Sequence, residues 1–129
     1  MRLAFAVLAI FAAVPALAQN KLDGLWKPAP IQMPDGTEID PYNCIPMEVD
    51  GATPIKGNWY GEMEGDCFME NPTSVRGFNG TLFDVTCKGD WGSRTTRQLF
   101  MLYDDVDSKE RLLIVGPEGP TVLERCAEE

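Results

Sequence analysis

The fold is decided by residues 94–126, which read RTTRQLFMLYDDVDSKERLLIVGPEGPTVLERC. Two apolar runs, LFMLY at 99–103 and LLIV at 112–115, are short and rich in residues that favour strands. The polar segment 104–109 between them is typical of a hairpin loop, and the Pro- and Gly-rich segment 117–120 is typical of a turn. The stretch therefore predicts three antiparallel strands joined by short connections, with the last strand at 121–126.

The final segment, TVLERCAEE at 121–129, has a second interpretation. Thr121 and Glu124 have the spacing of a helix capping box, which would fit a two-turn helix. Val122 and Leu123 favour a strand, and the preceding LLIV run needs a neighbour to pair with. We expect a strand and keep the helix as the alternative.

The alternation of apolar and polar residues continues toward the N-terminus. Within 81–88, Phe83, Val85 and Cys87 lie on one face of a strand. Turn signals at 71–72 and at 77–80 bracket a short middle strand. These patterns predict an all-β fold, a small antiparallel meander that forms a barrel or a sandwich.

Residues 28–57 interrupt this pattern, because they hold six of the ten prolines. Proline and glycine at this density exclude a long helix or a central strand. We expect an ordered, Pro-rich N-terminal excursion around Cys44 that contains one short strand. After a predicted signal peptide, residues 19–129 would form a single β domain.

The signal peptide is predicted at 1–18, MRLAFAVLAIFAAVPALA. Arg2 is its only charge, an apolar run follows, and Ala16-Leu17-Ala18 is a small-residue cleavage site. No later stretch is apolar for long enough to span a membrane. The short, Ala-rich signal is typical of bacteria, so we expect a secreted or periplasmic protein.

Four cysteines, Cys44, Cys67, Cys87 and Cys126, lie after the predicted signal. An even number of cysteines in a small exported chain predicts two disulfides. We prefer Cys67–Cys87 with Cys44–Cys126, because the segments around Cys67 and Cys87 flank a turn region. The pairing Cys44–Cys67 with Cys87–Cys126 stays open as the alternative.

The charge and the composition exclude several functions. The chain has 20 acidic and 11 basic residues and a net charge of −9, which disfavours nucleic acid and anionic membranes as partners. It has no His, so a Ser-His-Asp triad and a His-ligated metal site are excluded. The acidic loop 104–110 has carboxylates that suit a hard cation, but its spacing favours a solvated hairpin tip. We expect no enzymatic activity, no cofactor and no metal; the oligomeric state stays open.

A binding surface is predicted around residues 59–66, where the strand pattern puts Glu62, Glu64 and Asp66 in one acidic row. Like charges on one strand repel unless a basic group lies nearby, and such a group could belong to a basic protein partner. Trp91, in a Gly-rich turn, is a candidate exposed anchor. The complete predicted surface consists of Trp59, Tyr60, Glu62, Glu64, Asp66 and Trp91.

Gly24-Leu25-Trp26 resembles the Gly-x-Trp signature of lipocalin-like barrels. The resemblance implies that a basic residue from the last strand, Arg125, packs over the indole of Trp26. Small bacterial inhibitors of secreted metalloproteases share this barrel and this size. The resemblance implies an inhibitor or a ligand binder. From the acidic surface we expect an exported, non-catalytic binding or inhibitor protein that recognises a basic partner; the alternative is a small lipocalin-like barrel that binds a small apolar ligand or a metal ion.

Overall fold

The computed structural model describes residues 21–127, so the predicted signal peptide lies outside the described residues. Within this range all the regular structure is β-strand, and none of it is helix. The strands are β1 (Gly24–Pro28), β2 (Ile31–Gln32), β3 (Glu38–Ile39), β4 (Thr53–Lys56), β5 (Trp59–Glu62), β6 (Gly65–Val75), β7 (Gly80–Gly89), β8 (Gly92–Asp104), β9 (Glu110–Gly116) and β10 (Gly119–Arg125). The strand predicted at 121–126 is confirmed by β10, and the helical alternative is wrong.

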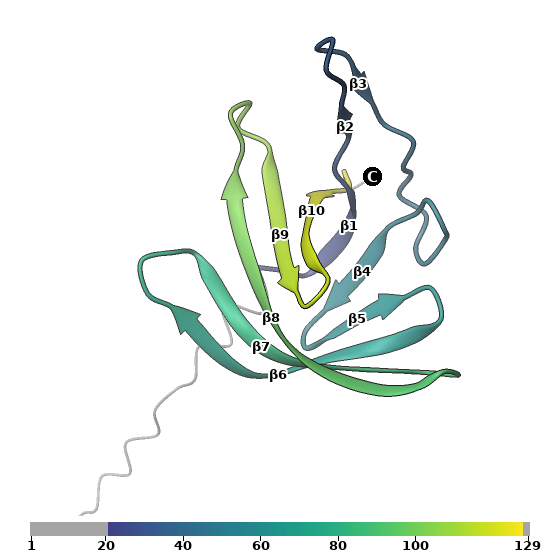
Figure 1. The fold of residues 1–129 in the computed structure, drawn as a ribbon, viewed down its shortest axis with the longest axis vertical. Helices are drawn as coiled ribbons and strands as arrows, with labels where there is room; N and C mark the ends of the chain where they lie inside the picture. Colours follow the sequence, from purple (N-terminus) through teal and green to yellow (C-terminus); the bar gives the residue numbers. More distant parts are fainter. Residues whose placement is uncertain (1–20, 128–129) are drawn as a thin grey trace, which may run out of the picture.

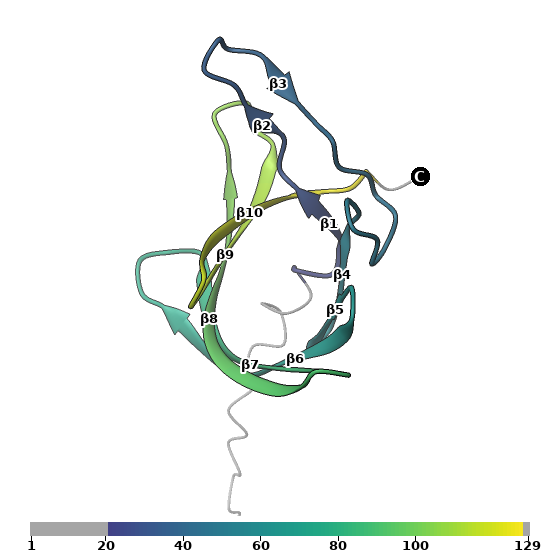
Figure 2. The same cartoon turned by 45° about the vertical axis from the view of Figure 1, so that its right-hand side comes forward.

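Eight of these strands close into an antiparallel barrel in the order β1-β10-β9-β8-β7-β6-β5-β4. Figure 1 shows the strands from the side, and Figure 2 views the same ring more nearly along its axis. The predicted all-β meander is therefore confirmed, in its barrel form. No helix in residues 21–127 is long and apolar enough to cross a membrane.

The barrel forms because every second residue of its strands points inward. On β7 the inward side chains Phe83 and Val85 are fully buried, and the Phe83 ring meets Phe100 of β8 edge-on at 5.5 Å between centroids. Other large buried side chains come from β1, β6, β9 and β10: Trp26, Met69, Leu112 and Leu123. These residues form the apolar core in one half of the barrel.

Trp26 and Arg125 close this filled half. Trp26 is fully buried and donates a hydrogen bond from Nε1 to the Leu22 carbonyl oxygen at 2.8 Å. The Arg125 guanidinium lies over the indole ring, with Cζ 4.2 Å from the centroid. The contact implied by the Gly-x-Trp resemblance is therefore present. Gly24 permits it, because a Cβ there would lie 2.6 Å from Arg125 Nη1.

The preferred disulfide pairing is confirmed. Cys67 and Cys87 are direct neighbours on β6 and β7, and both are buried. Cys44 is joined to Cys126, 82 residues later, which ties the Pro-rich excursion to the end of β10. Two disulfides in one small chain are typical of an oxidising compartment.

The turn predicted at 71–72 is wrong, because β6 runs through it to Val75. The register between β6 and β7 shifts from Glu70 to Thr73, which makes a β-bulge, and Asn71 takes a positive φ of 52°. Arg97 of β8 holds the bulge by donating to the Asn71 carbonyl oxygen and to Thr73 Oγ1. The Asn71-Pro72 pair correctly indicated an irregular backbone, but the irregularity is a bulge within β6 and not a turn that ends the strand.

The exclusion of a central strand from 28–57 is also wrong, because β4 pairs with β1 on one side and β5 on the other. Pro54 lies within it and lacks a backbone N–H. Pro54 is opposite Leu25 of β1, but the ladder between β4 and β5 begins only at Ile55, so Pro54 precedes the ladder on the β5 side.

The remaining part of the excursion, residues 29–52, is named the arm. Its strands β2 and β3 form a separate two-stranded sheet, with Ile31 opposite Ile39. Figures 1 and 2 both show this hairpin projecting away from the ring of strands. The arm therefore adds a second structural unit to the barrel without sharing its sheet.

Candidate functional site

One half of the barrel interior is not filled by the core. It opens at the end that carries the turns β5–β6, β7–β8 and β9–β10, which we call the open end. A cavity of about 310 Å³ lies there. The residues that line it come from β4, β5, β8, β9, β10 and the β9–β10 turn: Thr53, Tyr60, Glu62, Arg94, Thr96, Gln98, Ile114, Gly116, Pro117, Glu118, Gly119, Thr121 and Leu123.

Strand β8 explains why the interior changes character along the barrel. Its inward residues are Arg94, Thr96 and Gln98 toward the open end, then Phe100 and Leu102 in the filled half. Polar side chains in the interior need solvent or a hydrogen-bonding partner, whereas the aromatic and aliphatic ones pack together. The sequence RTTRQLFML therefore divides the interior into a wet half and a dry half.

Tyr60 lies at the boundary between the two halves. Only 7% of its surface is exposed, its ring packs near Phe100 at 6.1 Å, and its hydroxyl lies 3.8 Å from Cys87 Sγ. Burial raises the pKa of Tyr60 to about 12, and the negative charge of Glu62 acts in the same direction. The phenol is therefore a neutral hydrogen-bonding group at the floor of the cavity.

Charged side chains surround the cavity entrance. Glu62 extends from the end of β5, and within residues 21–127 it forms no ion pair with a Lys or Arg. Arg94 lies 3.7 Å from a Glu118 carboxylate oxygen, but both side chains are largely exposed, so this pair is weak. Its guanidinium also lies 5.9 Å from the centre of the Trp91 ring. The entrance thus combines two carboxylates, one guanidinium and one indole.

The predicted acidic row does not exist as one strand face. Strand β5 ends at Glu62, Glu64 lies in the following turn, and Asp66 belongs to β6. Asp66 accepts a hydrogen bond from Trp59 Nε1 at 2.8 Å, on the outside of the barrel. The period-two pattern was interrupted by a tight turn that has no proline or asparagine to mark it.

The structure nevertheless brings most of the predicted residues to the open end. Gly65 pairs with Gly89, which joins the β5–β6 turn to the β7–β8 turn. A Cβ on Gly89 would lie 2.4 Å from the Glu64 carbonyl oxygen and 2.7 Å from Trp91 Nε1, so only glycine allows these turns to meet. Trp91 is half exposed there. Tyr60 points into the barrel and is not accessible to a protein partner.

The cavity residues on β8, β9 and β10 were missed by sequence reasoning. Arg94, Thr96 and Gln98 occur at alternate positions, and this was the available signal. An alternating polar pattern looks the same on an outer face and on a solvated inner face. Only the closure of the barrel identifies these residues as interior ones.

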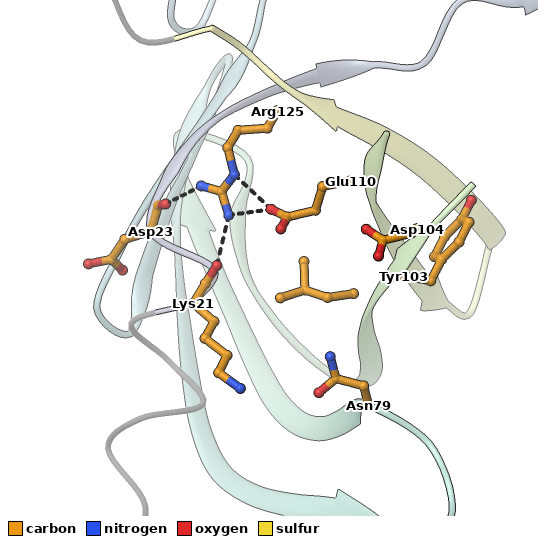
Figure 3. Close-up of a pocket in the computed structure, with 8 residues that line it drawn as sticks. Lys21, Asp23, Asn79, Tyr103, Asp104, Glu110 and Arg125 are labelled. Atoms are coloured by element: carbon orange, nitrogen blue, oxygen red, sulfur yellow. Dashed lines mark hydrogen bonds and ion pairs between the residues drawn. The ribbon is translucent and has the colours of Figure 1, made fainter. Parts of the chain in front are cut away.

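A second hollow lies at the opposite end of the barrel, and its centre is Arg125 (Figure 3). The guanidinium donates to the carbonyl oxygens of Asp23 at 2.6 Å and Lys21 at 2.9 Å, and from Nε to Glu110 Oε1 at 2.8 Å. Its nitrogen atoms are therefore engaged by the chain itself. This arrangement supports a structural role over Trp26 better than ligand binding.

Two groups of residues in the described part of the chain were considered as cation ligands, and both contain atoms that are engaged in other contacts. Glu62 lies close to Cys67 and Cys87, but both sulfur atoms belong to a disulfide and are not thiolate ligands. In the 104–110 loop, Asp105 accepts backbone hydrogen bonds and pairs with Arg111, and Glu110 pairs with Arg125. The Lys109 N–H is the main cause that lowers the pKa of Asp105. The loop uses these carboxylates to hold its own shape.

Comparison of the chain with protein-family models, with curated proteins and with solved structures finds no match.

Proposed function

We propose that this chain is an exported, non-catalytic binding protein that holds a small ligand in the open half of its barrel. The observation that carries the proposal is the cavity of about 310 Å³ at the open end. Sites for small molecules typically measure ~300–1,000 Å³ and combine apolar walls with a few polar groups. Here Ile114 and Leu123 supply apolar wall, and Tyr60, Thr96 and Gln98 supply hydrogen-bonding groups.

The lining favours a ligand with a compact apolar body and a cationic group. Such a molecule would place its apolar part against Ile114 and Leu123. Its ammonium group would lie near Glu62, which has no Lys or Arg partner within residues 21–127. A long acyl chain fits poorly, because Phe83, Phe100 and Trp26 fill the deeper half of the barrel.

Binding rather than catalysis is supported by the available side chains. The chain has no His. The serines Ser74, Ser93 and Ser108 all lie exposed on the surface, where no buried base activates them. The two disulfides support export, and together with the predicted signal peptide they favour the periplasm or the exterior of a bacterium.

The proposal is tested with three ligands of one size and shape: benzylamine, benzyl alcohol and benzoate. Thermal unfolding and tryptophan fluorescence of the disulfide-bonded protein are measured over a concentration series of each. Benzylamine is expected to raise the unfolding temperature and to bind most tightly, because it alone carries a cation. Glu62→Gln should remove most of the preference for the amine over the alcohol.

A cavity-filling variant provides the structural control. Gly116 lines the cavity without a side chain, and a Cβ there would make ordinary contacts of 3.5 Å with Gln98. Gly116→Leu should abolish binding, whereas Val122→Leu on the exposed outer face of β10 should not. Binding that survives Gly116→Leu unchanged, or no binding by any of the three ligands, would contradict the proposal.

A further inference from the structure

The arm exposes large apolar side chains to an unusual degree. Six of the eleven exposed large hydrophobic side chains of residues 21–127 lie within its 24 positions, 29–52. They are Ile31, Met33, Ile39, Ile45, Met47 and Val49. Ile31 and Ile39 are direct cross-strand neighbours, so they share one face of the β2–β3 sheet, and each is nearly half exposed. Within residues 21–127, β2 and β3 pair only with each other.

The arm is ordered without a core of its own. At the hairpin tip, Asp35 Oδ1 accepts hydrogen bonds from the N–H and the hydroxyl of Thr37, at 3.0 and 2.6 Å. Asp40 pairs with Lys27 of β1, and the Cys44–Cys126 disulfide holds the segment that leads from β3 back to the barrel. The hydrogen bond from Lys27 lowers the pKa of Asp40, so this contact persists at neutral pH.

The part of the arm that follows the β2–β3 hairpin, residues 43–52, is also held by hydrogen bonds. Asn43 N–H donates to the Asp50 carbonyl oxygen, Met47 N–H to Ala52 and Ala52 N–H to Ile45, each at 2.9 Å. A segment held in one conformation by polar contacts loses little further entropy when its apolar face is covered. These contacts make the arm a preorganised surface.

The charge of the arm selects the occupant of that surface. Residues 29–52 contain five carboxylates and no Lys or Arg. Lys27, which lies outside the arm, neutralises Asp40. The remaining acids, Asp35, Glu38, Glu48 and Asp50, are all exposed. A second copy of this acidic chain would be repelled, whereas a basic surface would be attracted.

We propose that the apolar face of the arm docks a protein partner whose contact surface is an apolar patch surrounded by Lys or Arg side chains. Ile31 and Ile39 supply the apolar contact, and the exposed carboxylates supply orientation and rate of encounter. This surface is distinct from the cavity of the barrel, so each can bind or fail without the other. It is also distinct from the surface predicted around residues 59–66.

The probes are three soluble amphipathic helices of equal length. The first has leucine on one face and lysine elsewhere, the second replaces lysine with glutamate, and the third replaces leucine with serine. Affinity for the full disulfide-bonded protein is measured at low and at high salt, and hydrogen exchange locates the contact. The leucine–lysine helix should bind, protect amides of residues 31–50 and weaken as salt increases.

Two double variants separate the apolar and electrostatic contributions. Ile31→Ser with Ile39→Ser should weaken the leucine–lysine helix about tenfold, because the central apolar contact is lost. Glu48→Gln with Asp50→Asn should weaken it about threefold at low salt and hardly at high salt. Phe78→Ser in the β6–β7 turn and Glu70→Gln on β6, both at exposed positions outside the arm, are the controls and should change nothing.

Several outcomes would overturn the inference. Equal binding of the glutamate helix excludes a basic partner, and equal binding of the serine helix reduces the effect to nonspecific charge attraction. Protection at the open end, or no binding at all, removes the arm as a docking site. A dimer seen by sedimentation that dissociates in the Ile31→Ser, Ile39→Ser variant would assign the face to a second copy instead.

Discussion

The barrel and the arm are stabilised by opposite means. The barrel buries Trp26, Phe83 and Phe100 almost completely, so its strands are held by the burial of apolar surface. The arm leaves Ile31 and Ile39 nearly half exposed and is held by hydrogen bonds, an ion pair and a disulfide. The comparison teaches that order and apolar burial are separable in this chain. Where they separate, apolar surface is left available to a partner.

The largest effect is expected from Phe83→Ala. Phe83 is fully buried and contacts the Phe100 ring, so its truncation leaves a cavity that the closed barrel cannot easily fill. The free energy of unfolding should fall by about 3–5 kcal/mol, measured with urea. The arm variant Ile39→Ala should lose less than a third of that. Equal losses would break the distinction between the two regions.

The next largest effect is expected from removing the disulfide that joins the two regions, with Cys44→Ser and Cys126→Ser. The bond closes a loop spanning 82 residues in sequence, so its loss frees the unfolded chain and should cost about 2–4 kcal/mol. Hydrogen exchange should also accelerate at Asn43 and Met47 of the arm more than at Val85 of the barrel. Equal acceleration in both regions would show that the disulfide stabilises the whole molecule and does not hold the arm in particular.

The smallest effect is expected from Tyr60→Phe, at the boundary between the wet and the dry half of the barrel. The pKa of Tyr60 is about 12 when the chain is folded, above the ordinary value of 10.0. The phenol therefore stabilises the folded state below pH 10, and this contribution is lost as the pH rises through 12. In Tyr60→Phe, the fall in unfolding free energy between pH 9 and 12 should be smaller by roughly 2 kcal/mol.

The matched control is Tyr103→Phe, which removes the hydroxyl of a tyrosine on β8 that does not line the cavity, and its unfolding free energy is measured over the same pH range. If Tyr60→Phe follows the alkaline curve of the unmodified protein, then Tyr60 is better solvated than its 7% exposure indicates. The wet half of the barrel would then extend past Tyr60 into the interior.

The sequence predicted the barrel strands well wherever their pattern came from burial. The LFMLY and LLIV runs became β8 and β9, and Phe83, Val85 and Cys87 point inward as expected. Burial leaves a regular pattern along a strand, so a single sequence can reveal it. The preference for Cys67–Cys87 came from the expected neighbouring strands, and Cys44–Cys126 was then the remaining pair.

The rest depended on contacts between distant residues. Whether Arg94, Thr96 and Gln98 face inward is decided by the closure of β4 against β1, far away in the sequence. The tight turn after Glu62 is permitted by the meeting of Gly65 and Gly89. Pro54 could be part of β4 because the pairing of β4 with β5 starts one residue later, at Ile55. None of these conditions is visible in a local window.

The closed ring has a consequence for the behaviour of the protein at high concentration. Each barrel strand pairs with a neighbour on both sides over part of its length, which leaves only partial edges, such as residues 92–98 of β8 on the β9 side. Strands β2 and β3 have free edges, but each is only two residues long, and Pro30, Pro34 and Pro41 flank them and lack donors for a growing ladder. The arm can therefore display apolar side chains while its strands resist strand-by-strand aggregation into fibrils.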